Sequence, residues 1–349
     1  MAHSSMTSMQ RVLTTLSHQE PDRVPLFLLA TMHGAKELGL SIQEYFSNAR
    51  NLVEGQLRFQ RKYRNDCIYG FFYAALEVEA FNGNVIFTED GPPNAGEPCL
   101  KQISDIHNLV APRMSEAKVL HKVLEAQQAL KEAVRGDVPI LGVVMSPFSL
   151  PVMQLGFERY LEVMHSHPLE FEHLMRVNEE FCVAWANAQL EAGATAICYY
   201  DPVSSPTIIP PSLYRETGFQ IAKRTIARIQ GPTATHFASG SSLAILNDVA
   251  DTGTAAVGVS ASEDLSQLKE SCRNKLAIIG NLNGVEMRRW TDQMAYESVR
   301  SAIETAAPGG GFILSDNHGE IPFQVPEQVL LAISEAVLEY GHYPLDGSE

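Results

Sequence analysis

Short apolar runs alternate with longer amphipathic segments along the whole chain. Each run is bounded by Gly, Pro or polar residues, which is typical of buried strands in a parallel sheet. The pattern predicts eight strands, at residues 24–29, 66–72, 138–144, 194–200, 233–237, 255–260, 276–280 and 312–315. Most of the segments between these strands are long enough for one helix.

Apolar residues recur at helical spacing in these intervening segments. Ser41 and Glu44 form a capping-box pattern at the start of one expected helix, and Gly193 ends another. A short helix also precedes the first strand. The expected helices cover residues 9–16, 41–63, 115–135, 168–192, 210–229, 242–249, 264–272, 291–306 and 326–340.

This alternation of strands and helices indicates parallel pairing with right-handed crossovers, and about eight such units close into a (β/α)8 TIM barrel. An open doubly wound sheet is the competing fold. It is disfavoured because no G-x-G-x-x-G motif follows the first strand. We therefore expect residues 1–349 to form a single barrel domain, with an N-terminal helical extension at about residues 7–20.

Composition excludes several classes of protein. The net charge of −15 argues against a nucleic-acid-binding surface, which needs clustered Lys and Arg. The five cysteines form no C-x-x-C pair, so reduced thiols fit best. No apolar run reaches the roughly 18 residues of a membrane span, and residues 1–5 lack the start of a signal peptide. A cytoplasmic location is expected.

Polar side chains follow several of the predicted strands, where active sites of such barrels lie. His236 and His318 come from the fifth and eighth strands and are the most informative pair. The other candidates at this end are Thr31, His33, Tyr73, Glu77, Glu79, Ser146, Asp201, Asn281, Asn283 and Asp316.

Each candidate also has a purely structural interpretation. His236 could be a core histidine bonded to backbone, and His318 and Asp201 could serve a turn. Glu77 and Glu79 flank Val78, so both could lie on the solvated face of a strand. The side chain of Asn281 could bond only to loop backbone, and Cys198, in an apolar run, is expected to belong to the core.

Five motifs together resemble the uroporphyrinogen decarboxylase superfamily, and their pattern is closest to its corrinoid-dependent methyltransferase branch, which includes the methylcobalamin:coenzyme M enzymes. The resemblance covers nearly the whole chain and implies a TIM barrel. The motifs are residues 21–25 (PDRVP), 76–80 (LEVEA), 201–202 (DP), 280–282 (GNL) and 318–322 (HGEIP).

The decarboxylase branch of this superfamily has an arginine-rich segment after the first strand that holds substrate carboxylates. The corresponding segment here, residues 29–34 (LATMHG), has no arginine. Tyr73 stands where that branch has an aspartate for the pyrrole N–H groups. Because a polycarboxylated tetrapyrrole needs cationic partners, decarboxylation of uroporphyrinogen is disfavoured, although His318 matches a histidine of that branch.

The methyltransferase branch binds zinc through an H-x-C motif and a later cysteine. His236 matches the histidine, Ala238 replaces the first cysteine, and His318 falls at or near the second. The resemblance therefore implies a zinc site made by His236, His318 and a carboxylate, with Glu79 preferred over Glu77 or Asp201. The alternative is that the metal is lost and His318 acts as a plain acid or base.

The resulting hypothesis is a methyltransferase that moves a methyl group between a small molecule and a corrinoid. No D-x-H-x-x-G pattern of corrinoid modules occurs, so methylcobalamin or another corrinoid is expected on a partner protein. The expected catalytic residues are His318, Asp201, Glu79, Tyr73 and Asn281. The alternatives are a decarboxylase-like lyase on another cyclic or aromatic acid, and a non-catalytic ligand-binding relative. Analogy with decarboxylases suggests a homodimer.

Overall fold

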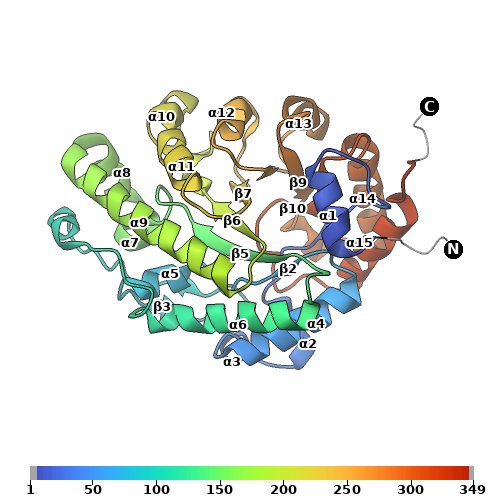
Figure 1. Cartoon of the computed structure of the whole chain (residues 1–349), viewed down its shortest axis with the longest axis horizontal. Helices are drawn as coiled ribbons and strands as arrows, with labels where there is room; N and C mark the ends of the chain where they lie inside the picture. Colours follow the sequence, from blue (N-terminus) through green and yellow to red (C-terminus); the bar gives the residue numbers. More distant parts are fainter. Residues whose placement is uncertain (1–5, 346–349) are drawn as a thin grey trace.

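The computed structural model describes residues 6–345. The expectation about a signal peptide concerns residues 1–5, which lie outside the described residues. Eight parallel strands follow one another in the order β1-β10-β9-β8-β7-β6-β5-β2 and are surrounded by helices (Figure 1). They are β1 (Leu26–Phe27), β2 (Ile68–Tyr69), β5 (Ile140–Met145), β6 (Ala196–Tyr200), β7 (Thr233–His236), β8 (Ala256–Gly258), β9 (Ala277–Leu282) and β10 (Phe312–Asp316).

Backbone and side-chain hydrogen bonds join the β1 and β2 segments and bring the two ends of the sheet together. The Asp66 backbone N–H donates to the Leu26 carbonyl over 2.7 Å, and the Asp66 carboxylate accepts from the Leu26 N–H over 2.8 Å. The Asn65 side-chain oxygen accepts from the Leu28 N–H at 2.7 Å. The sheet is thus a nearly closed cylinder, and the predicted (β/α)8 barrel is confirmed.

Buried charges hold the amino-terminal end of this seam. Asp66 is fully buried and accepts hydrogen bonds from Arg11 on α1 (Ser8–Leu16) at 2.6 Å and from Arg23 at 2.7 Å. Arg11 also pairs with Asp22 at 2.7 Å. A buried carboxylate needs such partners to remain charged. The PDRVP motif therefore anchors the first helix at the barrel end opposite the expected active site.

The remaining helices follow the strands around the outside of the barrel (Figure 1). None of the helices within residues 6–345 is long and apolar enough to cross a membrane. The α-helices are α2 (His33–Leu38), α3 (Ile42–Tyr45), α4 (Ala49–Tyr63), α5 (Ala75–Ala80), α6 (Lys118–Val134), α7 (Pro151–Leu155), α8 (Phe157–Ser166), α9 (Pro168–Ala192), α10 (Pro211–Glu216), α11 (Gly218–Ile226), α12 (Leu246–Ala250), α13 (Leu265–Cys272), α14 (Asp292–Ala306) and α15 (Glu327–Tyr340).

Short elements complete the chain and include features that the sequence pattern did not predict. A small antiparallel hairpin, β3 (Val85–Ile86) with β4 (Asn94–Ala95), stands where a plain loop was expected. Helices α7 and α8 were also not predicted. Four 3-10 helices occur in the described chain, η1 (Ile103–Asn108), η2 (Pro202–Ser204), η3 (Leu243–Ile245) and η4 (Glu286–Arg289).

Several predicted boundaries are confirmed and others change. The capping box of Ser41 and Glu44 is present, and α9 spans the predicted residues. The strand interpretation of Glu77 and Glu79 is wrong, because both lie on helix α5. The segment Ala75–Ala80 consists mostly of strong helix formers, and their propensity outweighs the Glu-Val-Glu alternation.

Candidate active site at the carboxyl ends of the strands

A row of residues crosses the barrel wall at the carboxyl ends of four strands. Met145 pairs with Tyr200, Tyr200 with His236, and His236 with Gly258. Neighbours in parallel register project to the same side of a sheet. The Tyr200 hydroxyl reaches the Gly319 carbonyl, on the loop after β10, over 3.0 Å. Tyr200 thus spans the barrel interior, and His236 faces the same interior.

Two tyrosines hold the loop that carries His318. The hydroxyls of Tyr69, on β2, and Tyr200, on β6, both donate to the Gly319 carbonyl, at 3.3 and 3.0 Å, and lie 3.1 Å apart. Gly319 has φ +95°, and a Cβ there would lie 2.3 Å from the Tyr200 hydroxyl. Only glycine fits this position, which explains the glycine of the HGEIP motif.

His236 is fixed between an aromatic ring and a glycine. Its ring stacks on the Tyr200 ring, with centroids 4.8 Å apart and planes inclined by 30°. Gly258 lies against the imidazole, and a Cβ there would lie 2.2 Å from His236 Cδ2. Nδ1 accepts a hydrogen bond from the Ala238 N–H at 3.0 Å. Burial, reinforced by His318, lowers the pKa of His236 to about 3, so the ring is neutral at pH 7.

His318 is exposed and lies on the same end of the barrel. Its Nδ1 is 2.5 Å from the Ser239 hydroxyl, which joins the loop after β10 to the loop after β7. The Asp316 carboxylate accepts from the backbone N–H groups of His318 and Gly319, at 2.9 and 3.0 Å, and so shapes the turn. Because Ser239 follows His236 by three residues, this contact places the loop after His236 next to His318.

Glu320 is a site residue that the sequence did not single out. Its carboxylate accepts hydrogen bonds from the Thr31 hydroxyl at 2.7 Å and from the Met32 N–H at 3.1 Å. Burial raises the pKa of Glu320 to about 8. This side chain ties the loop after β10 to the loop after β1. The HGEIP motif contained Glu320, but its partners lie at the other end of the sequence.

Asp201 is fully buried and organises two neighbouring loops. Its Oδ1 accepts from the hydroxyls of Ser146 at 2.6 Å and Ser149 at 2.8 Å, on the loop after β5. Burial raises the pKa of Asp201, opposed by these hydrogen bonds. Asn281 has a similar local contact, since its amide donates to the Ser260 carbonyl at 3.1 Å. Both contacts hold the rim of the barrel in place.

The two glutamates of α5 have different surroundings. Glu77 is buried, and its Oε1 accepts from the Met145 N–H at 3.0 Å, while burial raises its pKa to about 8. Glu79 is partly exposed and lies 3.5 Å from the Tyr73 hydroxyl, which also accepts from Lys122 at 3.1 Å. Glu79, Tyr73 and Lys122 line a separate cavity of about 320 Å³, whose lining includes neither His236 nor His318.

The expected zinc ligands are not brought together. Within residues 6–345 no group of three or more His, Cys, Asp or Glu is arranged to hold a metal ion. Glu79 lines the separate cavity, and the lone pair of His236 Nδ1 is occupied by the Ala238 N–H. His33 is also elsewhere, packed against the rings of Phe59 and Phe323. The donor set does not fit a zinc ion.

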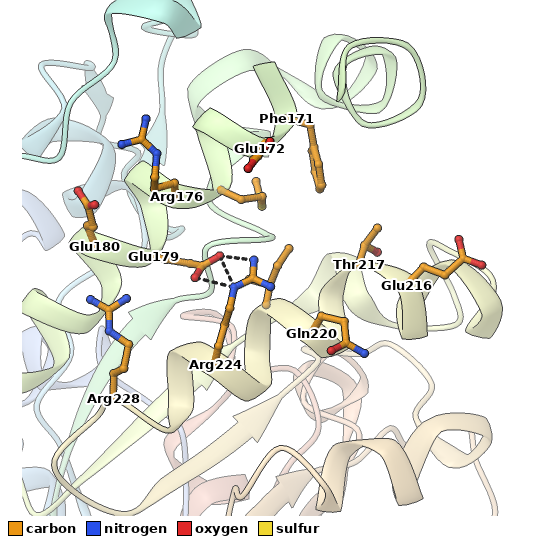
Figure 2. Close-up of a pocket in the computed structure, with 12 residues that line it drawn as sticks. Phe171, Glu172, Arg176, Glu179, Glu180, Glu216, Thr217, Gln220, Arg224 and Arg228 are labelled. Carbon is orange, nitrogen blue, oxygen red and sulfur yellow. Dashed lines mark hydrogen bonds and ion pairs between the residues drawn. The ribbon is translucent and has the colours of Figure 1, made fainter. Parts of the chain in front are cut away.

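A larger cavity lies on the outside of the barrel, between α9 and the helices α10 and α11 (Figure 2). It measures about 520 Å³ and is lined by both acidic and basic residues. Arg224 forms a double hydrogen bond with Glu179 across it. Since its lining includes none of the residues described above, this groove is not the candidate active site.

Comparisons with known proteins agree with this fold. A sequence profile described as "Uroporphyrinogen decarboxylase (URO-D)" matches residues 7–340. A uroporphyrinogen decarboxylase of Aromatoleum aromaticum is 25% identical, covering 92% of this chain and 94% of that protein. The methylcobamide:CoM methyltransferase MtaA of Methanosarcina barkeri is 30% identical, covering 54% and 57%. A methyltransferase structure from Methanosarcina mazei has a TM-score of 0.84 at 21% identity, covering 96% and 99%.

Proposed function

Because the chain belongs to the uroporphyrinogen decarboxylase family, we propose that it is an enzyme of this family that moves a methyl group between a small molecule and a corrinoid. The corrinoid is carried by a partner protein and reaches the open end of the barrel. When bound, it supplies the cobalt atom that gives or takes the methyl group. This chain supplies the pocket for the small molecule and the groups that handle its proton.

The observation that carries the proposal is the lack of Lys and Arg in most of the loop segments that follow the strands. The loop segments 28–32, 70–74, 146–150, 201–210, 237–242, 259–264 and 317–326 contain no Lys or Arg. After β9, Arg288 and Arg289 are exposed and bond to Val285 and Glu286 on their own turn. A polycarboxylated tetrapyrrole would leave its charges unpaired in such a site, which is costly. The similarity to MtaA supports the methyltransferase alternative.

The side chains divide into groups that contact the ligand and groups that position the loops. His236 faces the interior, and His318 is exposed at the rim, where its imidazole is accessible to water. A heteroatom that loses its methyl group keeps the electron pair and takes up a proton, and the reverse transfer releases one. Asp201, Asn281 and Glu320 hold the surrounding loops through the hydrogen bonds given above, so they are positioning residues.

The experiment is incubation of the purified protein with a corrinoid protein or methylcobalamin and a broad panel of methyl donors and acceptors, with cobalt absorbance as the readout. We expect a change with at least one pair, and its loss in His318→Gln. His107→Gln, with an exposed ring on η1, is the matched control. No absorbance change across the panel would refute methyl transfer.

The second candidate is decarboxylation of a cyclic or aromatic acid other than uroporphyrinogen. It is favoured by the near full-length similarity to uroporphyrinogen decarboxylases. Release of CO₂ from such acids, without any corrinoid present, would support it. Turnover of uroporphyrinogen itself would contradict both candidates as stated here.

A further inference from the structure

We infer that His236 works without a metal, as a fixed hydrogen-bond donor that presents Nε2–H to an uncharged oxygen atom of the ligand. The inference rests on the proposed function only in placing the ligand at the barrel mouth. It departs from the zinc chemistry that the resemblance implied, and it follows from the contacts of the His236 ring.

The tautomer of His236 is set by its backbone contact. A neutral imidazole has one N–H donor and one acceptor nitrogen. Nδ1 accepts from the Ala238 N–H at 3.0 Å, so the ring hydrogen must be on Nε2. Ala238 has φ +52°, in the left-handed region, at the turn that follows β7. This turn occupies the place where the H-x-C cysteine of the resembling enzymes stands.

The ring cannot readily adopt another orientation. It is held between the Tyr200 ring and Gly258, so tilting meets atoms on either side. A rotation by 180° would replace Nδ1 with Cδ2 and leave the Ala238 N–H facing a carbon. The Ala238 N–H is partly buried, and an unpaired N–H costs up to about 1–3 kcal/mol when it is buried completely. The orientation with Nε2–H is therefore strongly preferred.

This orientation is unsuited to zinc. Zinc binds a neutral imidazole through a nitrogen lone pair, and the lone pair of this ring is engaged by Ala238. Nδ1 of His318 is in turn bonded to the Ser239 hydroxyl. Ala238 contributes no sulfur. The site therefore lacks the lone pair of His236 and, within residues 6–345, the group of three or more His, Cys, Asp or Glu ligands that a zinc site requires.

The surroundings of Nε2 define the ligand class. Nε2 is buried and has no hydrogen-bond partner among residues 6–345. In the same interior row stand Met145, Tyr200 and Ile279, which are apolar or aromatic. The adjacent loop segments lack cations, so an anionic ligand would be poorly compensated. A carbonyl, ether or hydroxyl oxygen on a neutral, partly apolar molecule satisfies the donor best.

Long-range ¹H–¹⁵N NMR of histidine-labelled, metal-depleted protein tests the tautomer. The signals of His236 are those missing in His236→Gln. We expect the Nε2–H pattern, unchanged by one equivalent of Zn²⁺. A ring with Nδ1–H, or a zinc-dependent shift of both ring nitrogens, would overturn the inference. Neither result depends on methyl transfer, so failure here is distinguishable from failure of the proposed function.

Small probes test the ligand class in the same spectra. Acetophenone and anisole offer a neutral oxygen, toluene offers the same ring without one, and benzoate offers a charged one. We expect a shift of the His236 Nε2–H signal with acetophenone or anisole and none with toluene. A shift with benzoate alone, or with no probe up to its solubility limit, would reject the ligand class.

A pair of substitutions gives a second readout. The amide nitrogen of Gln in His236→Gln can stand near the Nε2 position, whereas that of Asn in His236→Asn stands near Nδ1. If Nε2–H is the working group, probe affinity should fall by no more than about tenfold in the Gln variant, comparable to one weakened hydrogen bond. The Asn variant should lose probe binding. Equal loss in both would count against a donor role.

Discussion

The imidazole of His236 and the phenol ring of Tyr200 stack with centroids 4.8 Å apart. The two residues are register partners on β7 and β6, so the barrel wall itself sets this contact. Because Tyr200 also reaches Gly319 on the loop after β10, the stack links the buried histidine to the loop of His318.

Gly258→Ala should disrupt the stack. The added methyl group would lie 2.2 Å from His236 Cδ2, so the ring must move towards Tyr200. We expect loss of activity and a destabilisation of about 1–3 kcal/mol from overpacking, measured by urea unfolding. Gly91→Ala, in a loop where the new Cβ lies 3.2 Å from the Thr88 hydroxyl, is the control. An unaltered His236 NMR signal in Gly258→Ala would contradict this packing.

Tyr69→Phe and Tyr200→Phe should show strong coupling. Either hydroxyl alone can satisfy the Gly319 carbonyl, so each single change should cost about 1 kcal/mol or less. The double variant leaves the carbonyl without both donors and should cost more than the sum of the singles. Urea unfolding of the four proteins provides the double-mutant cycle. Simple additivity would show that the shared acceptor is unimportant.

Glu77→Gln should change the pH dependence of stability. The pKa of Glu77 is about 8 in the folded protein, compared with an ordinary value of 4.5. As the pH rises, the unfolded chain therefore loses this proton at a lower pH than the folded protein does. Between these pH values stability falls as pH rises, by at most about 1.4 kcal/mol per pH unit. Gln keeps an acceptor for the Met145 N–H and removes this slope.

The matched control for Glu77 is Glu79→Gln, on the same helix but partly exposed. It removes one carboxylate from the same helix without touching the Met145 N–H and so serves as the comparison. Thermal unfolding from pH 4 to 9 is the measurement, and the variant Glu77→Gln should exceed the parent in stability at the alkaline end. Identical profiles for Glu77→Gln and the parent would contradict the assigned proton.

Asp66→Asn should be severely destabilising. The change removes the negative charge facing Arg11 and Arg23 in a buried site, and such losses cost about 3–5 kcal/mol. Glu54→Gln breaks an exposed ion pair with Arg58 and should cost less than about 0.5 kcal/mol. Comparison of the two urea midpoints tests the buried network. Similar midpoints would mean that the guanidinium groups find other partners.

The sequence pattern predicted the barrel because its apolar runs and helices alternate, and these are local properties. It placed His236 and His318 at one end because parallel strands share a direction. It missed Glu320 because the partner Thr31 is 289 residues away. It misplaced Glu79 because the Glu-Val-Glu alternation covers only three residues, which is too short to distinguish a strand from a helix. The contact between Gly258 and His236 arises only from strand register.

The seam between β1 and β2 has a practical consequence for redesign of the chain. One carboxylate, that of Asp66, both bridges the two edges of the cylinder and anchors the first helix. Shortened versions that begin after this helix would therefore weaken the closure of the barrel itself. Circular permutants should instead open the surface connection near Val110, whose side chain is 74% exposed, and keep the original amino-terminal junction intact.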